Sequence, residues 1–513
     1  MDEGLVEDRM QLGRLIEGLN IHYFRGDPEL EIEGLAYDSR LVGPGYLFVA
    51  LKGQTLDGHD FMKHAVQNGA VALVADEFQG FDGETATVRV RDAREALSAL
   101  SVKFYDEPYK DINLTGITGT NGKTTTSYLL ESILLAAGKR PGVIGTINYR
   151  LPGQTLDAPV TTPESLDLMR ILRKMADADV TDVVMEVSSH ALDQGRVRDC
   201  PFRTGIFTNF SRDHLDYHQS MEAYFEAKSL FFQDLKKWGP KDFTRAVVNA
   251  DDLKAKELAD LINVPVITYG LGRDCDVRAE DVRVTRAGLT ARLISPVGET
   301  KIKSGLIGDF NIYNILAAGA AALCMDIDLK QIVSGIEDLK GVPGRLELVK
   351  NSRSLAIVVD YAHTPDALLK SLKAVKPLVK GRLITLFGCG GDRDKGKRWE
   401  MGRVAGEHSD LLFVTSDNPR TEDPSIIASQ IEEGVKHSGL KKLRNLSGNG
   451  LTGPGYVLDL DRRNAIRMAV SVADKSDLIL IAGKGHEDYQ IIGTDKRNFD
   501  DRKVSAEAAS QEA

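Results

Sequence analysis

The chain has 513 residues, of which 42% are hydrophobic and 27% are charged. That balance is ordinary for a globular protein, and it excludes a wholly disordered, collagen-like or small disulfide-stapled chain. The 65 Lys and Arg residues against 75 Asp and Glu residues give a net charge of −10. Over this length the acidic excess is mild, and it argues against a general nucleic-acid or membrane-surface binder.

The cysteines and the N-terminus indicate the compartment. Cys200, Cys275, Cys324 and Cys389 lie far apart with no CxxC pair, so no zinc or redox motif follows. Reduced thiols in a cytoplasmic protein are the expected state. The acidic N-terminus has no apolar core, as a secretory signal would, and no window approaches the roughly 20 apolar residues of a membrane span. We therefore expect a cytoplasmic protein that binds no membrane.

The length suggests about three domains, and apolar runs divide the chain accordingly. Residues 1–107 are predicted to form a small mixed α/β domain, with strands at the apolar runs 46–50 and 71–74. Residues 108–344 are predicted to form a central P-loop ATPase-like α/β domain. Residues 345–513 are predicted to form a C-terminal doubly wound, Rossmann-like domain.

The second segment alternates strands and helices. A strand at 111–117 precedes a loop at 118–123 and then a helix, on which Leu130 and Leu134 share one apolar face. Further elements are expected as strands at 183–185, 205–207 and 246–248, β-hairpins at 276–306, and a helix from about Asn311.

The third segment alternates most regularly. Strands are predicted at 355–359, 382–387, 411–415, 456–460 and 477–482, with helical patterns between them. Alternation at this spacing indicates a parallel, doubly wound sheet. Such sheets bind their ligands at the carboxyl ends of the strands, so the loops that follow the strands are the candidate site.

The strongest chemical signal is a glycine-rich loop between a strand and a helix. Glycines let backbone N–H groups point at phosphate oxygens, and the helix N-terminus adds positive potential. Lys123 can neutralise the β- and γ-phosphates, and Thr124 can place a hydroxyl on Mg²⁺. The commoner pattern has its first glycine where this chain has Ile117, and the alternative is a glycine-rich turn with an exposed lysine. The loop comprises Gly119, Thr120, Asn121, Gly122, Lys123, Thr124 and Thr125.

Two further strand ends carry groups that suit a metal ion. Glu186 ends one strand, where its carboxylate can hold a metal ion or its water; the alternative is a structural capping role. His214 follows another strand. From spacing alone, a role as a metal ligand or as a support for one competes evenly with that of a plain loop histidine.

Lys228 lies where an apolar side chain is expected. Met221, Phe225, Lys228, Phe232 and Leu235 recur at helical spacing on one face. One interpretation is that Lys228 snorkels to solvent. The other is a partly buried amine with a lowered pKa, which can react with CO₂ to give a carbamate, an anionic oxygen ligand suited to Mg²⁺. The pattern does not choose between them.

The strand ends of the third segment gather charged groups. Asp360 and His363 follow one strand, as groups that contact a nucleotide do. Arg393 and Arg420 follow two others and can hold carboxylates, while Glu487 can hold an ammonium group. Together they suit a zwitterionic, amino-acid-like ligand, although each alone could be a solvated surface charge. No GxGxxG pattern opens this segment, which argues against a dinucleotide site.

These motifs, in this order, resemble the Mur ligase family, ATP-dependent amide-bond-forming enzymes of peptidoglycan synthesis. The resemblance covers essentially the whole chain. It rests on Gly119 to Thr124, Glu186 to His190, Asp213 with His214, Gly308 to Asn311 with Asn314, Gly344 with Arg345, and Asp360 to His363. Tyr37 to Arg40, and Leu47 to Ala50 with Gly53, are similar to the branch that adds the third amino acid. Asp417 to Arg420 resembles the version of that branch that adds meso-diaminopimelate.

The resemblance implies a role for each matching residue. ATP would be bound by the phosphate loop together with Asn314, Arg345 and Asp360. The UDP-linked substrate would contact Tyr37, Ser39, Gln54, Thr161, Thr162, Ser188, Gln194 and Arg196. Diaminopimelate would be bound by Arg393, Asp417, Asn418, Arg420, Gly483 and Glu487. Mg²⁺ would be held by Thr124, Glu186, His214 and carbamylated Lys228, and Lys123, Glu186, His214 and Lys228 would be the catalytic set.

The resemblance thus implies a cytoplasmic, monomeric ligase that adds meso-diaminopimelate to UDP-N-acetylmuramoyl-L-alanyl-D-glutamate through an acyl phosphate. ATP and Mg²⁺ would be required, in a reaction that supplies the cell wall and so serves cell shape and division. Alternatives are the same reaction with L-lysine, and a folylpolyglutamate-type ligase. A nucleotide-dependent switch that ligates nothing is the alternative from another class. Arg420 and the uridine-binding pattern favour the first.

Overall fold

The computed structural model describes residues 9–53, 56–78, 83–239, 243–443 and 453–510. The chain divides into two compact units. Unit 1 comprises residues 1–211, 218–269 and 320–326, and unit 2 comprises residues 212–217, 270–319 and 327–513. Gln54, predicted to contact the UDP-linked substrate, lies outside the described residues. The three domain boundaries predicted from the sequence stay a prediction.

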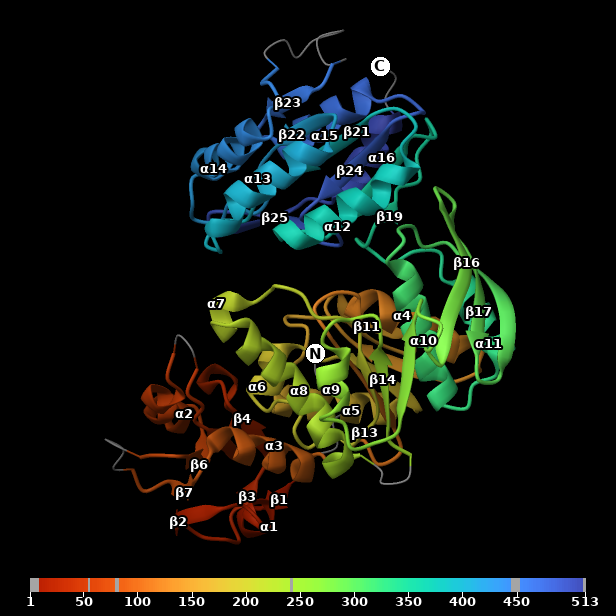
Figure 1. Ribbon diagram of the computed structural model, residues 1–513. Coiled ribbons are helices and arrows are strands. Elements are labelled where there is room, and N and C mark those ends of the chain that lie inside the picture. The colour runs from red at the N-terminus through yellow and green to blue at the C-terminus, as the bar shows by residue number, and fades with distance from the viewer. Residues whose placement is uncertain (1–8, 54–55, 79–82, 240–242, 444–452, 511–513) are drawn as a thin grey trace. The chain divides into compact units, whose positions relative to one another are not determined.

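Unit 1 begins with a small mixed sheet, drawn in red and orange in Figure 1. Its five strands have the order β2-β7-β6-β5-β4, in which β4 to β7 are parallel and β2 pairs antiparallel with β7. The strands predicted at 46–50 and 71–74 are β5 and β6. The elements are β1 (Met10–Gln11), α1 (Leu12–Ile16), β2 (Ile21–Arg25), β3 (Glu31–Ile32), β4 (Gly34–Ala36), β5 (Tyr46–Val49), α2 (Met62–Gln67), β6 (Ala70–Ala75), β7 (Ala86–Val90) and α3 (Ala93–Phe104).

The central sheet of unit 1 brings the phosphate loop and Glu186 to one edge. Its order is β11-β10-β9-β12-β8-β13-β14-β15, and the six strands from β9 to β15 in that order run parallel. β8 lies between β12 and β13, so the three loops after these strands are neighbours. The strands predicted at 111–117, 183–185, 205–207 and 246–248 are confirmed as β8, β12, β13 and β14.

The bounds of these central elements follow the apolar runs of the sequence. They are β8 (Asn113–Thr118), α4 (Lys123–Ala136), β9 (Pro141–Ile144), β10 (Asn148–Leu151), β11 (Gln154–Asp157), α5 (Ser165–Asp177), β12 (Asp182–Glu186), α6 (Ser189–Asp193), β13 (Phe202–Phe207), α7 (Leu215–His218), α8 (Met221–Trp238), β14 (Arg245–Asn249), α9 (Ala255–Ala259) and β15 (Val266–Gly270).

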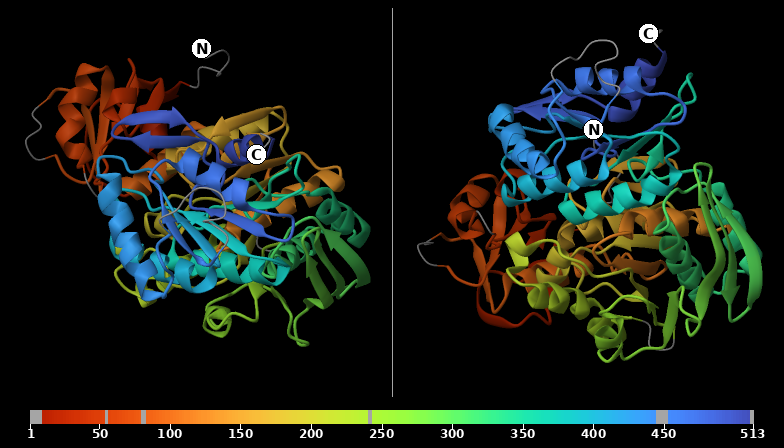
Figure 2. Two further views of the ribbon diagram at one scale, coloured as in Figure 1. Left: turned by 90° about the horizontal axis from the view of Figure 1, so that it is seen from above. Right: turned by 45° about the horizontal axis from the view of Figure 1, so that its top comes forward.

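Unit 2 contains three antiparallel strands and a helix pair before its main sheet. The strands are β16 (Val277–Thr285), β17 (Gly288–Ser295) and β18 (Gly298–Ser304), and Figure 2 shows them in green. They confirm the hairpins predicted at 276–306. The helices are α10 (Asn311–Cys324), as predicted from Asn311, and α11 (Leu329–Asp338), whose first turn is closed by a capping box between Asp328 and Gln331. Residues 320–324 of α10 belong to unit 1.

The C-terminal sheet has six strands in the order β19-β20-β24-β21-β22-β23, and all but the edge strand β19 run parallel. Side chains of β20 alternate between two cores: Val358 packs with α12, α13 and α14, while Ile357 and Val359 pack with α15 and α16. Helices therefore cover both faces (Figure 1). The predicted α/β fold class and the doubly wound C-terminal sheet are confirmed.

The five strands predicted in this segment are β20, β21, β22, β23 and β24. The elements are β19 (Glu347–Leu348), β20 (Ala356–Asp360), α12 (Pro365–Val375), β21 (Leu383–Phe387), α13 (Gly396–His408), β22 (Leu411–Val414), α14 (Pro424–His437), β23 (Gly455–Leu458), α15 (Arg462–Val472), β24 (Leu478–Ala482), β25 (Tyr489–Ile492), β26 (Asp495–Asn498) and α16 (Asp501–Ser510). In the described part of the chain, no helix combines the length and apolarity needed to cross a membrane.

Candidate active site

Two glycines shape the phosphate loop between β8 and α4. Gly119 has φ +140°, and a Cβ there would lie 1.9 Å from the Thr208 hydroxyl oxygen. Gly122 has φ +89° and is the N-cap residue of α4. A side chain at Gly119 would clash with Thr208, and a side chain at either glycine would strain the backbone, because both have positive φ. The loop therefore brings backbone N–H groups to the start of a 14-residue helix, where an anion is stabilised.

Asn209, which follows the neighbouring strand β13, holds this loop in place. The Asn121 backbone N–H donates to Asn209 Oδ1 at 3.0 Å, and the Thr120 N–H donates to the Asn209 carbonyl at 2.8 Å. Lys123 Nζ donates to the carbonyls of Gly119 and Thr120 at 2.8 and 3.0 Å. The lysine ammonium is thus held over the loop, where β- and γ-phosphates would lie.

Glu186 ends β12 as a buried carboxylate surrounded by donors. Its side chain accepts hydrogen bonds from the Thr124 hydroxyl at 3.0 Å, the Thr146 hydroxyl at 2.9 Å and the Thr146 N–H at 3.0 Å. The glutamate is only 1% exposed. Sequence reasoning missed Thr146, although Gly145-Thr146 follow the apolar strand β9 and so occupy the same sheet edge.

The oxygen atoms beside the phosphate loop suit Mg²⁺. The Glu186 carboxylate and the Thr124 hydroxyl, 3.0 Å apart, are hard oxygen donors of the kind that this ion prefers. Among the described residues no three His, Cys, Asp or Glu side chains form a metal-binding cluster. The predicted set differs, since it includes a hydroxyl and a carbamate. His214 belongs to unit 2, has φ +53°, and places Nε2 3.6 Å from Asp213 Oδ2.

Lys228 lies in the apolar face of α8, as its spacing predicted. It is 1% exposed, and its Nζ donates to the Gly119 carbonyl at 3.0 Å. The same atom lies 4.7 Å from the centre of the Tyr224 ring. Snorkelling to solvent, one of the two interpretations of this residue, is wrong. The amine instead touches the phosphate loop, where a carbamate oxygen would also lie near the ATP phosphates.

The residues predicted to hold the UDP-linked substrate include an interlocked group beside Glu186. The Thr162 hydroxyl donates to the Glu186 carbonyl at 2.8 Å and accepts from the Ser188 N–H at 3.0 Å. Arg196 donates to the Thr162 carbonyl at 2.9 Å and to Gln194 Oε1 at 2.6 Å. The structure therefore brings together four of the predicted residues. A fifth, Thr161, joins them through Thr146, the two hydroxyl oxygens being 3.2 Å apart.

Tyr37 and Ser39 follow β4 of the small N-terminal sheet in unit 1. The Tyr37 hydroxyl donates to Asp167 of α5 at 2.5 Å, and burial, together with that carboxylate, raises the pKa of Tyr37. Ser39 is 6% exposed, and its hydroxyl lies 2.9 Å from His64 Nδ1. Tyr37 therefore also ties the small sheet to the central one, a role that sequence reasoning missed.

In unit 2, Asp360 organises the segment that carries Arg345. Its carboxylate accepts from the Leu346 N–H at 2.8 Å, the Ala362 N–H at 3.0 Å and the Ser371 hydroxyl at 2.8 Å, and burial raises its pKa. The Arg345 guanidinium lies 4.8 Å from the centre of the Tyr361 ring. Asn314 is buried on α10 and donates to Asn311 Oδ1 at 2.8 Å.

The predicted amino-acid site gathers at the carboxyl ends of β22 and β24. Asn418 donates to Glu487 Oε2 at 2.9 Å, and the nearby Asp417 carboxylate is buried. Gly483 has φ +112°, and a Cβ there would lie 2.9 Å from Asp417 Oδ2. Burial raises the pKa of Glu487. The structure thus brings four of the six predicted residues together around two carboxylates.

Arg420 is also part of the predicted amino-acid site, and an ion pair holds its loop in place. Arg420 has φ +51° and donates to the Gly391 carbonyl at 2.8 Å. Arg398, which is fully buried, donates to Glu422 at 3.0 and 2.9 Å and to the Gly390 carbonyl at 3.1 Å. This pair, missed by sequence reasoning, locks the loop of Arg420 to the loop of Arg393. Arg393 itself is exposed.

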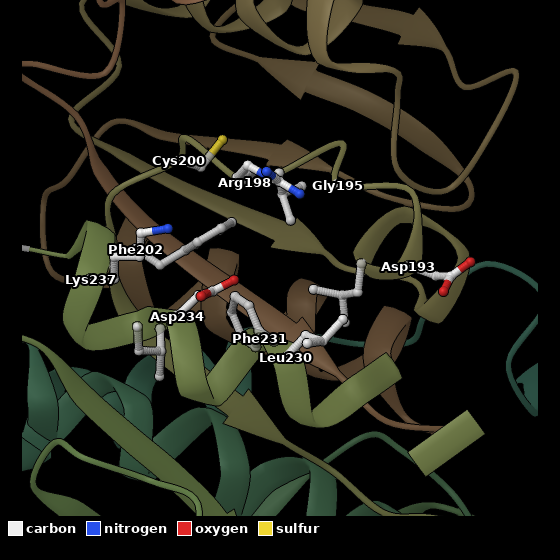
Figure 3. A pocket seen from close by; sticks show the side chains of 12 residues that line it. Asp193, Gly195, Arg198, Cys200, Phe202, Leu230, Phe231, Asp234 and Lys237 are labelled. Carbon is white, nitrogen blue, oxygen red and sulfur yellow. The ribbon is translucent and has the colours of Figure 1, made fainter. Parts of the chain in front are cut away.

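A separate cavity of about 260 Å³ lies beside α8. Leu230, Asp234 and Lys237 line it from α8, and Arg198 and Cys200 line it from the segment before β13 (Figure 3). None of the predicted site residues lines this cavity.

Comparison with known proteins supports the family suggested by the motifs. The Mur ligase middle domain matches residues 117–322, the Mur ligase glutamate ligase domain matches residues 344–485, and the Mur ligase family catalytic domain matches residues 31–105. The UDP-N-acetylmuramoyl-L-alanyl-D-glutamate--2,6-diaminopimelate ligase of Geobacter sulfurreducens is 47% identical over 500 residues, 97% of each chain. This chain belongs to the Mur ligase family.

Other Mur ligases are also similar to this chain in sequence or structure. The diaminopimelate ligase of Bacillus licheniformis is 42% identical over 97% of this chain and 99% of its own. A solved structure of a ligase of the same name superposes with a TM-score of 0.69 at 33% identity, covering 98% of each chain. MurF of Acinetobacter baumannii superposes with a TM-score of 0.64 at 21% identity, over 93% of this chain and 96% of its own, which shows the fold alone.

Proposed function

We propose that this Mur ligase joins meso-diaminopimelate to the D-glutamate of UDP-N-acetylmuramoyl-L-alanyl-D-glutamate, with ATP as co-substrate. The observation that carries the proposal is the edge of the C-terminal sheet, where the buried Asp417 carboxylate and the partly buried Glu487 carboxylate lie with the loop of Arg420. The two relatives named above, at 47% and 42% identity over nearly their full length, carry the name of this activity. The enzyme makes an amide bond at the expense of ATP.

The reaction needs activation because a carboxylate is a poor acyl donor. An oxygen of the D-glutamate γ-carboxylate attacks the γ-phosphorus of ATP, the bond to the bridging oxygen breaks, and ADP leaves. Lys123 and the backbone N–H groups at the start of α4 stabilise negative charge on the transferring phosphoryl group. The product of this half-reaction is an acyl phosphate, which carries its own leaving group.

The second half-reaction forms the amide. The amine of diaminopimelate attacks the acyl carbon, and a tetrahedral intermediate collapses. The carbon–oxygen bond to phosphate breaks, and inorganic phosphate leaves with the former carboxylate oxygen. A proton leaves the amine as the new bond forms. We expect Thr162, Gln194 and Arg196 to hold the muramoyl-dipeptide so that its carboxylate meets the ATP phosphate, and the hydrogen bonds of Arg196 to the other two residues support this role.

Mg²⁺ would be held by Thr124 and Glu186, with carbamylated Lys228 as a further ligand. When bound, it neutralises phosphate charge. Glu186 is kept in place by Thr146, and Lys228 is kept against the loop by the Gly119 carbonyl. We place the enzyme in the cytoplasm, since ATP and the UDP-linked precursor are cytoplasmic metabolites, and we expect it to act as a monomer.

Acceptor choice follows from charge. Diaminopimelate has a second carboxylate and ammonium at its far end, whereas L-lysine has an ammonium alone. Arg420 can grip that carboxylate bidentately. A site built for a charged group rejects a ligand that lacks it, because the arginine is left unpaired. The same reaction with L-lysine is therefore the second candidate, and Arg420 speaks against it.

The test is phosphate release and product formation with the UDP-muramoyl-dipeptide and ATP, comparing meso-diaminopimelate with L-lysine. We expect product with diaminopimelate and at least a ~100-fold lower kcat/KM with lysine. Arg420→Ala should narrow the preference for diaminopimelate. Arg403→Ala should keep that preference, because Arg403 is a partly exposed arginine that pairs with Glu407 on α13. Efficient turnover of lysine by the wild-type enzyme would contradict the acceptor. No turnover with either amino acid would contradict the ligase assignment.

A further inference from the structure

One buried cation in the amino-acid site has no role in the reaction as described so far. Lys484 lies in the loop after β24 and is fully buried. Its Nζ donates to Asn418 Oδ1 at 3.1 Å and to Glu487 Oε2 at 3.1 Å, and it lies 3.5 Å from Asp417 Oδ1. All three partners are residues assigned above to the amino acid. Lys484 therefore stands behind the binding surface and touches each of its acidic or amide groups.

The charges of this cluster do not balance. Asp417 and Glu487 are both within ion-pair distance of a single ammonium, that of Lys484. Two carboxylates and one ammonium leave one negative charge uncompensated in a buried site. Such a charge is costly unless a further cation pairs with it.

Arg462 is a further buried cation near this cluster, and it already has an ion-pair partner. Arg462 is fully buried and donates to Asp501 at 2.8 and 2.7 Å, and Asp501 is itself fully buried. Arg462 also donates to the Ala482 carbonyl at 3.1 Å, at the end of β24. This neutral pair supports the strand end without supplying the missing positive charge.

Asp417 shows where the missing charge would sit. Its side chain is about nine-tenths buried, yet its Oδ1 atom accepts no hydrogen bond from any residue that the structure describes. A buried carboxylate oxygen without a donor costs free energy that an added donor would recover. An ammonium group of a ligand supplies both the donor and the charge.

We propose that Lys484 is a positioning residue that sets this cluster to receive one ammonium group, the distal one of the incoming amino acid. It does so by fixing the Asn418 and Glu487 side chains and by leaving a single negative charge for the ligand. This inference rests on the proposed function. It extends that function by explaining why a buried lysine lies in a site that binds a cation.

Loss of the lysine has a definite expected effect. Burial raises the pKa of Glu487, and the Lys484 ammonium opposes that rise. Without it, one of the two carboxylates takes up a proton, and Glu487 keeps the hydrogen bond from Asn418 but loses the one from Lys484. The ligand ammonium then gains less from the site, while ATP and the UDP-linked substrate, which bind elsewhere, are unaffected.

The experiment compares two acceptors in two enzymes. The acceptors are meso-diaminopimelate and an analogue in which hydrogen replaces the distal amine. Wild-type enzyme should prefer diaminopimelate in kcat/KM by at least about tenfold, since the analogue leaves a buried carboxylate unpaired. In Lys484→Met that preference should shrink to within about threefold, with the KM values for ATP and the UDP-linked substrate unchanged.

Lys436→Met is the matched control, because Lys436 is an exposed lysine paired with Glu432 on α14 of the same unit. It should keep the wild-type preference. Lys484→Gln, which keeps a donor but removes the charge, should behave like Lys484→Met. Adding Glu487→Gln to the Lys484→Met enzyme should lower kcat/KM for diaminopimelate much less than adding it to wild-type enzyme, because the two residues act as one unit.

Four results would overturn the proposal. A Lys484→Met enzyme that is slower with both acceptors but keeps the preference would show a merely structural role. So would failure of both Lys484 variants to fold while Glu487→Gln folds. Equal use of both acceptors by wild-type enzyme would rule out recognition of the distal ammonium but would still agree with the proposed ligase function. Absence of ligation with either acceptor would remove the proposed function itself, and the inference with it.

Discussion

Lys228 and Lys484 are both buried lysines, but their neighbours differ. Lys484 lies beside two carboxylates, whereas Lys228 donates to a backbone carbonyl and lies beside the Tyr224 ring. In our proposal, the first arrangement leaves one negative charge for the ammonium group of a ligand. The second places an amine at the phosphate loop, where conversion to a carbamate would turn a positive charge into an anionic oxygen ligand.

Substitution of Lys228 tests the carbamate. Lys228→Ala should lower kcat by about 100-fold, as loss of a group that supports a metal site does. Formate or acetate should restore part of the activity, because a small carboxylate can enter the space left and supply an oxygen. Initial rates with and without these anions measure the effect.

Lys236→Ala is the control, since Lys236 is an exposed lysine on the same helix. It should change neither the rate nor the response to carboxylates. Unchanged activity of Lys228→Ala without added anions would show that the metal-ligand role is wrong.

At the scale of elements, α15 and α16 are joined by two ion pairs of very different burial. Arg462 and Asp501 are fully buried, whereas Arg463 and Glu507 have side chains that are 41% and 62% exposed. Burial makes the first pair sensitive to loss of one partner, because the remaining charge is left unpaired in the interior. Solvent screens the second pair.

Asp501→Asn should therefore lower the free energy of unfolding of the C-terminal sheet by about 3–5 kcal/mol. Glu507→Gln should change it by less than about 1 kcal/mol. Urea unfolding curves of the two variants measure the difference. Similar stability of both variants would mean that the buried pair does not anchor α16 to the end of β24.

Much of the fold could be predicted from local sequence. Apolar, β-branched runs bounded by glycine or polar residues marked β8, β12 and β13, and the spacing of apolar residues placed Lys228 on the buried face of α8. Glycine, lysine and threonine between a strand and a helix marked the phosphate loop. These features depend on neighbours within a few residues, which is why the sequence alone was sufficient.

The missed residues depend on contacts between distant segments. Lys484 is flanked by glycines in a loop, and nothing nearby shows that it is buried, since its partner Asn418 lies 66 positions away. Arg398 is likewise buried by Glu422, 24 positions later. Thr146 reaches Glu186 only because β9 lies beside β12. The order of strands in the sheet brings these segments together, and local periodicity does not predict that order.

At the scale of the whole molecule, stability should depend on pH through His486. Burial, together with Arg345, lowers the pKa of His486 to about 4, against an ordinary value of 6.5. The folded protein thus holds this histidine neutral while the unfolded chain protonates it near its ordinary pKa. Its contribution is complete above pH 6.5 and is lost as the pH falls toward 4.

His486→Gln should remove this part of the pH dependence. Between pH 7 and pH 4.5 the wild-type protein should lose up to about 3 kcal/mol more stability than the variant. Of the two tryptophans in the chain, Trp399 belongs to α13, so its fluorescence in a Trp238→Phe background follows unfolding of the C-terminal sheet. Parallel loss of stability in both proteins would show that His486 is not held neutral.

The central claim is that ATP activates the D-glutamate carboxylate as an acyl phosphate before diaminopimelate attacks it. The most direct measurement uses UDP-N-acetylmuramoyl-L-alanyl-D-glutamate labelled with ¹⁸O in the γ-carboxylate, with ATP and meso-diaminopimelate. Mass spectrometry of the phosphate released should find one ¹⁸O atom in each phosphate, in step with amide formation. Unlabelled phosphate, or phosphate released without amide, would contradict the account.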